Sequence, residues 1–245
     1  MKKSRYQLLD TIRGIVLVSM IIYHACWNFV YIYGMNWGWY RSKGAYLWQQ
    51  SICWTFIMLS GFCFSLGKKH LKNGLTVFGS GVLVTVVTLI AMPGNRVVFG
   101  VLTCIGSCIL LLTFTEKIWK KIPTEAGMAA AFLLFLFSKN INSGYLGFTS
   151  LRLMELPANW YSNYVTAFIG FPFEGFYSTD YFSLIPWFFL YLTGYYGYGI
   201  FRKYGLTGRE FMKRGIEIFA FMGRHSLLIY LLHQPLIYVT QEFIF

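Results

Sequence analysis

The sequence predicts an all-α membrane protein, a bundle of about seven transmembrane helices. Of its 245 residues, 56% are hydrophobic and only 12% are charged, whereas about a quarter of the residues in a soluble domain are charged. Apolar runs near the ~20 residues needed to cross a bilayer recur along the chain. Lysine and arginine gather in alternate connections, as they do in cytoplasmic loops. We therefore expect a single integral-membrane domain over residues 1–245, passing several times through the cell membrane.

The apolar runs give the expected helices in order. The seven predicted spans are residues 8–33, 47–66, 75–92, 97–114, 126–137, 182–201 and 218–240. The first span is long and lacks a small-residue cleavage site, so we expect it to stay in the membrane rather than act as a signal peptide. The fifth is the shortest. Pro186 in the sixth should kink the helix or begin its regular part.

The basic residues set the orientation of the chain. Fourteen of them lie in one set of alternate segments, namely Lys2, Lys3, Arg5, Lys68, Lys69, Lys72, Lys117, Lys120, Lys121, Arg202, Lys203, Arg209, Lys213 and Arg214. The other set holds five, namely Arg41, Lys43, Arg96, Lys139 and Arg152. The positive-inside rule then places the N-terminus in the cytoplasm and, with seven spans, the C-terminus outside.

The charges and the cysteines argue against two classes of partner, nucleic acids and metal ions. A net charge of +12 is compatible with nucleic-acid binding, but the positive-inside pattern already accounts for where these charges lie. The five cysteines all lie in apolar runs, without the spacing of a zinc site. We expect no nucleic acid, no metal, and cysteines that act as small buried residues.

One long connection, residues 138–181, lies on the predicted outer side. Loops longer than about 15 residues are usually functional or disordered. This one is rich in aromatic residues and ends beside Asp180, at the outer entrance of the sixth span. We expect it to be ordered and to cap the outer mouth of the bundle with an interfacial helix.

The first span carries three ionisable residues, Asp10, Arg13 and His24. A helix turns about 100° per residue, so Asp10 and Arg13 lie within about 40° and about 20° of His24, and Asn28 continues this stripe. Such a stripe should face the bundle interior or a wet cavity. Asp10 and Arg13 can pair near the cytoplasm, while His24 lies alone in the outer half.

Each of these residues has a structural and a functional interpretation. Asp10 and Arg13 either anchor the helix as an interfacial ion pair, or Arg13 meets an anionic ligand entering from the cytoplasm. His24 is either a hydrogen-bonding residue between helices or a general base. An imidazole with an unperturbed pKa of about 6.5 is suited to deprotonating a hydroxyl or an amine near neutral pH.

The last span offers a second polar set in the segment GRHSLLIYLLHQP, residues 223–235. Ser226 and His233 are seven residues apart and lie within about 20° on one face. Arg224 and His225 lie at its cytoplasmic mouth, where a phosphate-bearing ligand could be held. Hydrogen bonding between helices explains Ser226 equally well, whereas His233 lies deep in the span.

Several of these segments resemble membrane acyltransferases. The stretch RYQLLDTIRGI, followed by His24, resembles their opening, and a histidine at this position is taken as catalytic in the bacterial envelope O-acyltransferases. Three more segments resemble the heparan-α-glucosaminide N-acetyltransferase catalytic-domain family in its short bacterial form: FGVLTCIGSCILL, DYFSLIPWFFLYLTG and GRHSLLIYLLHQP. Their order and spacing fit, and together they span nearly the whole chain.

The resemblance implies transfer of an acyl group, typically acetyl, from cytoplasmic acyl-CoA to an amine or hydroxyl of an extracytoplasmic sugar or envelope glycan. His24 would be the base, and Asp180 would orient the acceptor or the base. We place His233 with them in the catalytic site. Related enzymes also raise a homodimer as an oligomeric state.

The resemblance also implies a binding site for acyl-CoA at the cytoplasmic mouth. Arg13 and Arg224 would bind the CoA phosphates. Asp10, His225 and Ser226 belong to the same cofactor-binding set.

Two positions depart from the family pattern. The lysosomal enzyme has asparagine at the position of His24 and a luminal histidine after the first helix. The corresponding segment here, MNWGWYRSKGAY, has no histidine, so His24 takes that role if the chain is catalytic. The family's fourth span often carries histidine where this chain has Thr103, which weakens any catalytic role for Thr103.

Other functions compete with the acyltransferase. Buried Asp, Arg and His residues also form proton relays and substrate paths in transporters, although this chain shows no internal repeat. A retinal-binding photoreceptor needs a lysine in the last span, and no lysine follows Lys213. A non-catalytic accessory protein of envelope assembly remains a further alternative.

Overall fold

The computed structural model describes residues 6–149 and 151–243, and these are mostly helical. The chain forms two compact units, one of residues up to 56 with those from 202 onward, the other of residues 57–201. Three helices are long and apolar enough to cross a membrane, namely α1 (Gln7–Tyr31), α3 (His70–Ala91) and α4 (Val101–Trp119). The prediction of a helical chain with helices of membrane-spanning length and hydropathy is confirmed, while seven spans and the side of each terminus stay predictions.

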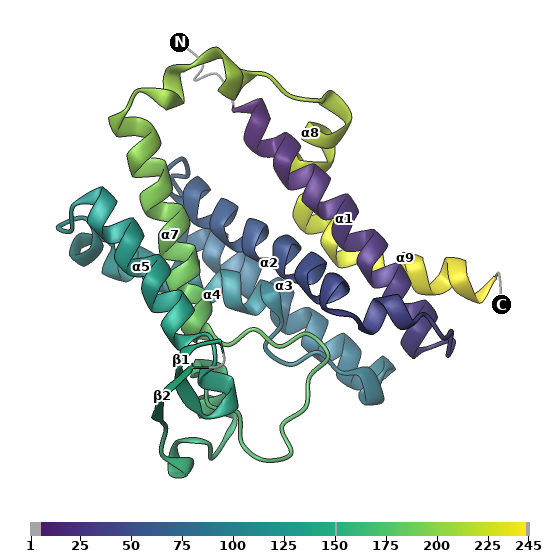
Figure 1. Ribbon diagram of the computed structural model, residues 1–245. Helices are drawn as coiled ribbons and strands as arrows, with labels where there is room; N and C mark the ends of the chain where they lie inside the picture. Colours follow the sequence, from purple (N-terminus) through teal and green to yellow (C-terminus); the bar gives the residue numbers. More distant parts are fainter. Residues whose placement is uncertain (1–5, 150, 244–245) are drawn as a thin grey trace. The chain divides into compact units, whose positions relative to one another are not determined.

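The first unit is built around α1. Its other elements are the 3-10 helix η1 (Gly38–Arg41), the first part of α2 (Lys43–Phe64), the 3-10 helices η5 (Leu206–Gly208) and η6 (Glu210–Lys213), α8 (Glu217–Arg224) and α9 (Ser226–Glu242). Both α8 and α9 pack against α1 (Figure 1). Elements from the first and the last part of the sequence therefore belong to one unit.

Glycines bring α1 and α8 into backbone contact. A Cβ atom on Gly14 of α1 would overlap the carbonyl oxygen of Phe219, and one on Gly223 of α8 would overlap the carbonyl oxygen of Asp10. Small residues at a helix crossing let two backbones approach closely. Any larger side chain at Gly14 or Gly223 would force the two helices apart.

The predicted last span, 218–240, is wrong as a single helix. The structure divides it into α8 and α9, with His225 (φ −105°, ψ 19°) between them. The glycine contacts hold α8 along α1, and the chain leaves helical geometry at His225, one residue before α9 begins. The eight residues of α8 are too few to cross a bilayer.

The second unit holds the remaining helices. In chain order they are the rest of α2, α3, the 3-10 helix η2 (Pro93–Asn95), α4, α5 (Thr124–Ser138), α6 (Tyr164–Ile169) and α7 (Leu184–Lys203). α3 and α4 lie side by side (Figure 1), because Gly81 of α3 leaves room for Thr103 of α4. Cys104 and Cys108 are fully buried, as expected of small core residues, whereas Cys26, Cys53 and Cys63 are only partly buried.

Two local predictions for this unit have counterparts in the structure. The fifth predicted span overlaps α5, a helix of 15 residues, and its crossing of the membrane stays a prediction. In α7, Ile185 has non-helical angles (φ −98°, ψ 130°) directly before Pro186. Proline cannot donate a backbone hydrogen bond, and the regular helix begins at Pro186 as the sequence predicts.

The long connection is ordered over its described residues. It contains the 3-10 helices η3 (Ile141–Ser143) and η4 (Ala158–Trp160), the antiparallel hairpin of β1 (Tyr145–Phe148) and β2 (Leu151–Glu155), and the short helix α6. Tyr161 donates a hydrogen bond of 2.6 Å to the carbonyl of Ile141, and burial raises the pKa of its hydroxyl. That the connection caps the outer mouth stays a prediction.

Candidate functional site

The first unit brings His24 and His233 together. The Nδ1 atom of His24 lies 3.0 Å from Nε2 of His233, and the ring centroids are 4.9 Å apart. The two residues are 209 positions apart in the sequence and sit on α1 and α9, which pack side by side (Figure 1). His233 is only 6% exposed. The expectation that His24 lies alone is therefore wrong, because α9 supplies a second imidazole.

A backbone carbonyl completes this polar chain. The Nδ1 atom of His233 is hydrogen bonded to the carbonyl oxygen of Tyr230, one turn earlier in α9. The Tyr230 ring also packs on the His233 ring, with centroids 5.1 Å apart. The orientation of His233 is thus set from within its own helix.

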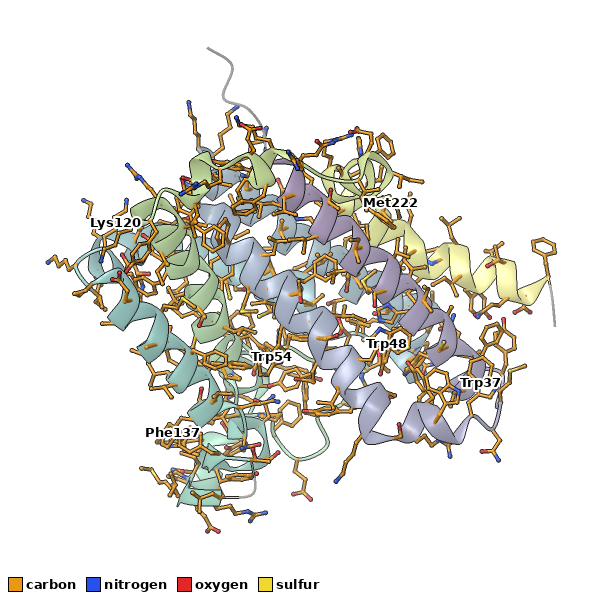
Figure 2. The ribbon with its side chains drawn as sticks, turned by 45° about the horizontal axis from the view of Figure 1, so that its top comes forward. Trp37, Trp48, Trp54, Lys120, Phe137 and Met222 are labelled. Carbon is orange, nitrogen blue, oxygen red and sulfur yellow. The ribbon has the colours of Figure 1, made fainter. Side chains whose placement is uncertain are left out.

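Aromatic side chains pack around the C-terminal half of α1. Tyr23 contacts the rings of Tyr40 and Trp48, each with a centroid distance of 5.1 Å. Trp48, labelled in Figure 2, donates a hydrogen bond of 2.8 Å to Ser19. Tyr40 donates to the carbonyl of Tyr23 at 3.0 Å, and burial raises the pKa of the Tyr40 hydroxyl well above its usual value. These contacts fix the part of α1 that carries His24.

Two buried amides extend the site beyond the histidines. Gln241 of α9 donates a hydrogen bond of 3.1 Å to the carbonyl of Ala25, and Asn28 lies one turn further along α1. Asn28 and Gln241 are 1% and 4% exposed. Neither Oδ1 of Asn28 nor Oε1 of Gln241 has a hydrogen-bond partner among the described residues.

Sequence reasoning identified Asn28 on the stripe but missed Gln241. Gln241 lies eight residues after His233, a spacing that returns to the same side of a helix. This spacing was the signal that could have placed Gln241 beside His233. Without it, a glutamine near the end of an apolar segment is interpreted as the polar boundary of the span.

Asp10 and Arg13 pair as their spacing predicts. Their side chains are 3.5 Å apart, with the Asp10 side chain 7% exposed and that of Arg13 22% exposed. The burial of Asp10 follows from the close crossing of α8, since Gly223 packs directly on the Asp10 backbone. The pair therefore lies at the α1–α8 contact.

Arg224 has a partner that sequence reasoning did not identify. Its guanidinium lies 2.8 Å from a carboxylate oxygen of Glu217, within the same helix. The other oxygen of Glu217 accepts a 2.6 Å hydrogen bond from Gln7 of α1. His225 bonds through Nδ1 to the carbonyl of Phe221 at 2.9 Å, and Ser226 begins α9. The predicted cofactor-binding residues of this segment thus gather where α8 meets α9.

Asp180 belongs to the second unit. Its Oδ2 atom accepts a hydrogen bond of 3.1 Å from the backbone N–H of Val101. This N–H is in the first turn of α4, where backbone donors have no partner within the helix. Asp180 therefore stabilises the start of α4, and its role toward an acyl acceptor stays a prediction.

Among the described residues, no three His, Cys, Asp or Glu side chains are grouped so that they could hold a metal ion. The chemical groups that the first unit brings together are two imidazoles, two amides and two arginine–carboxylate pairs. Such a set can move a proton and bind an anion.

Comparison with protein families shows which family the chain resembles. A family model described as "Heparan-alpha-glucosaminide N-acetyltransferase, catalytic" matches residues 5–235, nearly the whole chain. Comparisons with curated proteins and with solved structures gave no match. The family match together with the three apolar helices indicates a membrane acetyltransferase.

Proposed function

This chain belongs to the heparan-alpha-glucosaminide N-acetyltransferase catalytic family, and we propose that it is an acyl-CoA-dependent acyltransferase. It moves an acetyl group from cytoplasmic acetyl-CoA to an amine or hydroxyl of an extracytoplasmic sugar or envelope glycan. It acts as a multi-pass protein of the cell membrane. The observation that carries the proposal is the partly buried contact between His24 and His233.

In this reaction His24 acts as the general base. The acceptor oxygen or nitrogen bonds to the acyl carbon while its proton passes to the imidazole. The carbon–sulfur bond of the thioester breaks, and CoA leaves as a thiolate that takes up the proton. A positioned base of this kind contributes about 10²–10⁴-fold to the rate.

The two buried amides support binding of the acceptor next to this base. A buried acceptor atom without a hydrogen bond costs about 1–3 kcal/mol. The amide oxygens of Asn28 and Gln241 would accept hydrogen bonds from O–H or N–H groups of the incoming sugar. An acceptor rich in such donors is therefore favoured over an apolar one.

The arginines support binding of CoA at the other end of α1. Arg13 and Arg224 each contact one carboxylate, but a guanidinium has five N–H donors in a fork that suits phosphate. Asp10 and Glu217 would hold the two arginines in place, and His225 and Ser226 would complete the cofactor site.

A transporter is a second candidate, because α8 and α9 form an interrupted helix. Discontinuous helices line the substrate path in many secondary transporters. The histidine pair would then serve as a proton relay.

The test uses purified protein in lipid nanodiscs, with labelled acetyl-CoA and two acceptor probes. Methyl α-glucosaminide carries an amine where methyl α-glucoside carries a hydroxyl, so the pair separates the two acceptor types. Transfer of label to either sugar supports the proposal. Absence of saturable acetyl-CoA binding would contradict it, and solute uptake into vesicles without acyl-CoA would favour the transporter.

A further inference from the structure

We propose that His233 is a positioning residue that holds His24 in its Nδ1–H tautomer, so that Nε2 of His24 is the nitrogen that takes the proton. The last step rests on the proposed function, since it needs a reaction in which His24 is the base. The tautomers themselves follow from the contacts of the two rings.

The first step concerns His233. Its Nδ1 atom is hydrogen bonded to the carbonyl oxygen of Tyr230. A carbonyl oxygen can only accept a hydrogen bond, so the hydrogen must be on Nδ1 of His233. A neutral imidazole carries one hydrogen on its two nitrogens. Nε2 of His233 therefore presents a lone pair.

The second step passes this assignment to His24. Nε2 of His233 lies 3.0 Å from Nδ1 of His24. Two lone pairs at this distance would repel each other, whereas an N–H opposite a lone pair forms a hydrogen bond. Nδ1 of His24 must therefore carry the hydrogen. By the same rule, Nε2 of neutral His24 is left with the lone pair of a base.

The chain also stabilises the charge that proton transfer creates. When Nε2 of His24 takes a proton, the Nδ1–H donates more strongly to His233, which in turn donates more strongly to the Tyr230 carbonyl. Hydrogen bonds in such a chain polarise one another, and burial strengthens them. His233 is 6% exposed, so water does not compete for these contacts.

Free histidine side chains in water favour the opposite tautomer, with the hydrogen on Nε2. The proposed arrangement therefore has a spectroscopic signature. The chain has only four histidines, so ¹⁵N-histidine labelling gives a simple NMR spectrum that single substitutions can assign. At a pH where both rings are neutral, we expect the hydrogen on Nδ1 in both His24 and His233. A hydrogen on Nε2 of His24 would overturn the proposal.

Two variants test whether His233 is responsible. In His233→Gln the side-chain oxygen can still accept from Nδ1–H of His24, whereas His233→Leu removes the acceptor and keeps an apolar side chain. We expect the Gln variant to keep the His24 tautomer and the Leu variant to lose it. The turnover number for methyl α-glucosaminide should fall about tenfold further in the Leu variant, with an unchanged KM for acetyl-CoA.

The control is His70→Gln in the second unit, where His70 stacks on Phe64. It should leave the His24 signals and the rate unchanged. Equal rates in the Gln and Leu variants, or a His24 tautomer that both retain, would overturn the positioning role. The wild-type spectrum tests the tautomers even if the Leu variant does not fold. If the NMR spectrum shows the expected tautomers but the protein transfers no acyl group, the proposed function is contradicted while the tautomer assignment of the two rings stands.

Discussion

The two contacts that α1 makes, with α8 and with α9, are built in opposite ways. Against α8 the backbones meet directly, with Gly14 and Gly223 at the crossing and the arginine–carboxylate pairs beside it. Against α9 the contact runs through side chains, and it buries imidazoles and amides. The first contact allows two backbones to approach closely, and the second brings polar side chains of two helices together. Substitutions should therefore damage the fold at one and the reaction at the other.

The largest expected effect is on the fold, from Gly14→Val in α1. The new side chain would overlap the Phe219 carbonyl, and overpacking of this kind costs about 3 kcal/mol. We expect the Tm of the protein in detergent to fall steeply, together with acetyl-CoA binding. Gly38→Ala is the matched control, because nothing lies within 4 Å of its Cβ position. A Gly14→Val protein as stable as this control would show that α8 is not packed tightly on α1.

A smaller and purely functional effect is expected from Asn28→Leu, a change in α1 at its contact with α9. The substitution removes the unpartnered amide oxygen and keeps a similar side-chain volume. We expect the KM for methyl α-glucosaminide to rise about tenfold, the value of about one hydrogen bond, while the Tm stays the same or increases. A lower Tm with an unchanged KM would make Asn28 a structural residue.

The smallest effects are expected at the arginines. Arg13→Ala and Arg224→Ala should each weaken acetyl-CoA binding several-fold, measured by calorimetry, because partly exposed charges contribute modestly. The loss should shrink as salt is raised, since salt screens exposed charges. Lys203→Ala, which removes a basic residue outside the proposed site, serves as the control. If all three variants bind acetyl-CoA with the same affinity, Arg13 and Arg224 do not bind CoA and only anchor their helices.

The α1–α8 and α1–α9 contacts also mark what could be predicted from the sequence. Local spacing was enough to pair Asp10 with Arg13 and to begin the regular part of α7 at Pro186. The pairing of His24 with His233 depends on how α1 packs against α9, and no local pattern encodes this. The break at His225 falls on the polar stretch Arg224–Ser226, which we interpreted as the cytoplasmic mouth of one continuous span rather than as a boundary between two helices.

The residues that were missed share one physical cause. Gln241 bonds to Ala25 of another helix, and Glu217 joins Arg224 of its own helix to Gln7 of α1. Helical periodicity gives the face on which a side chain lies, but not which neighbour covers that face. The family resemblance supplied the function class for the same reason, since it carries tertiary information that single-sequence periodicity lacks.

The most direct test of the acyltransferase proposal is single-turnover acetyl transfer by wild type and His24→Gln in nanodiscs, with acetyl-CoA affinity measured beside it. We expect the rate to fall about 10²–10⁴-fold while the Kd for acetyl-CoA is unchanged, because His24 acts on the acceptor and not on CoA. A His24→Gln protein that transfers acetyl at nearly the wild-type rate would contradict the role of the histidine pair as the catalytic centre.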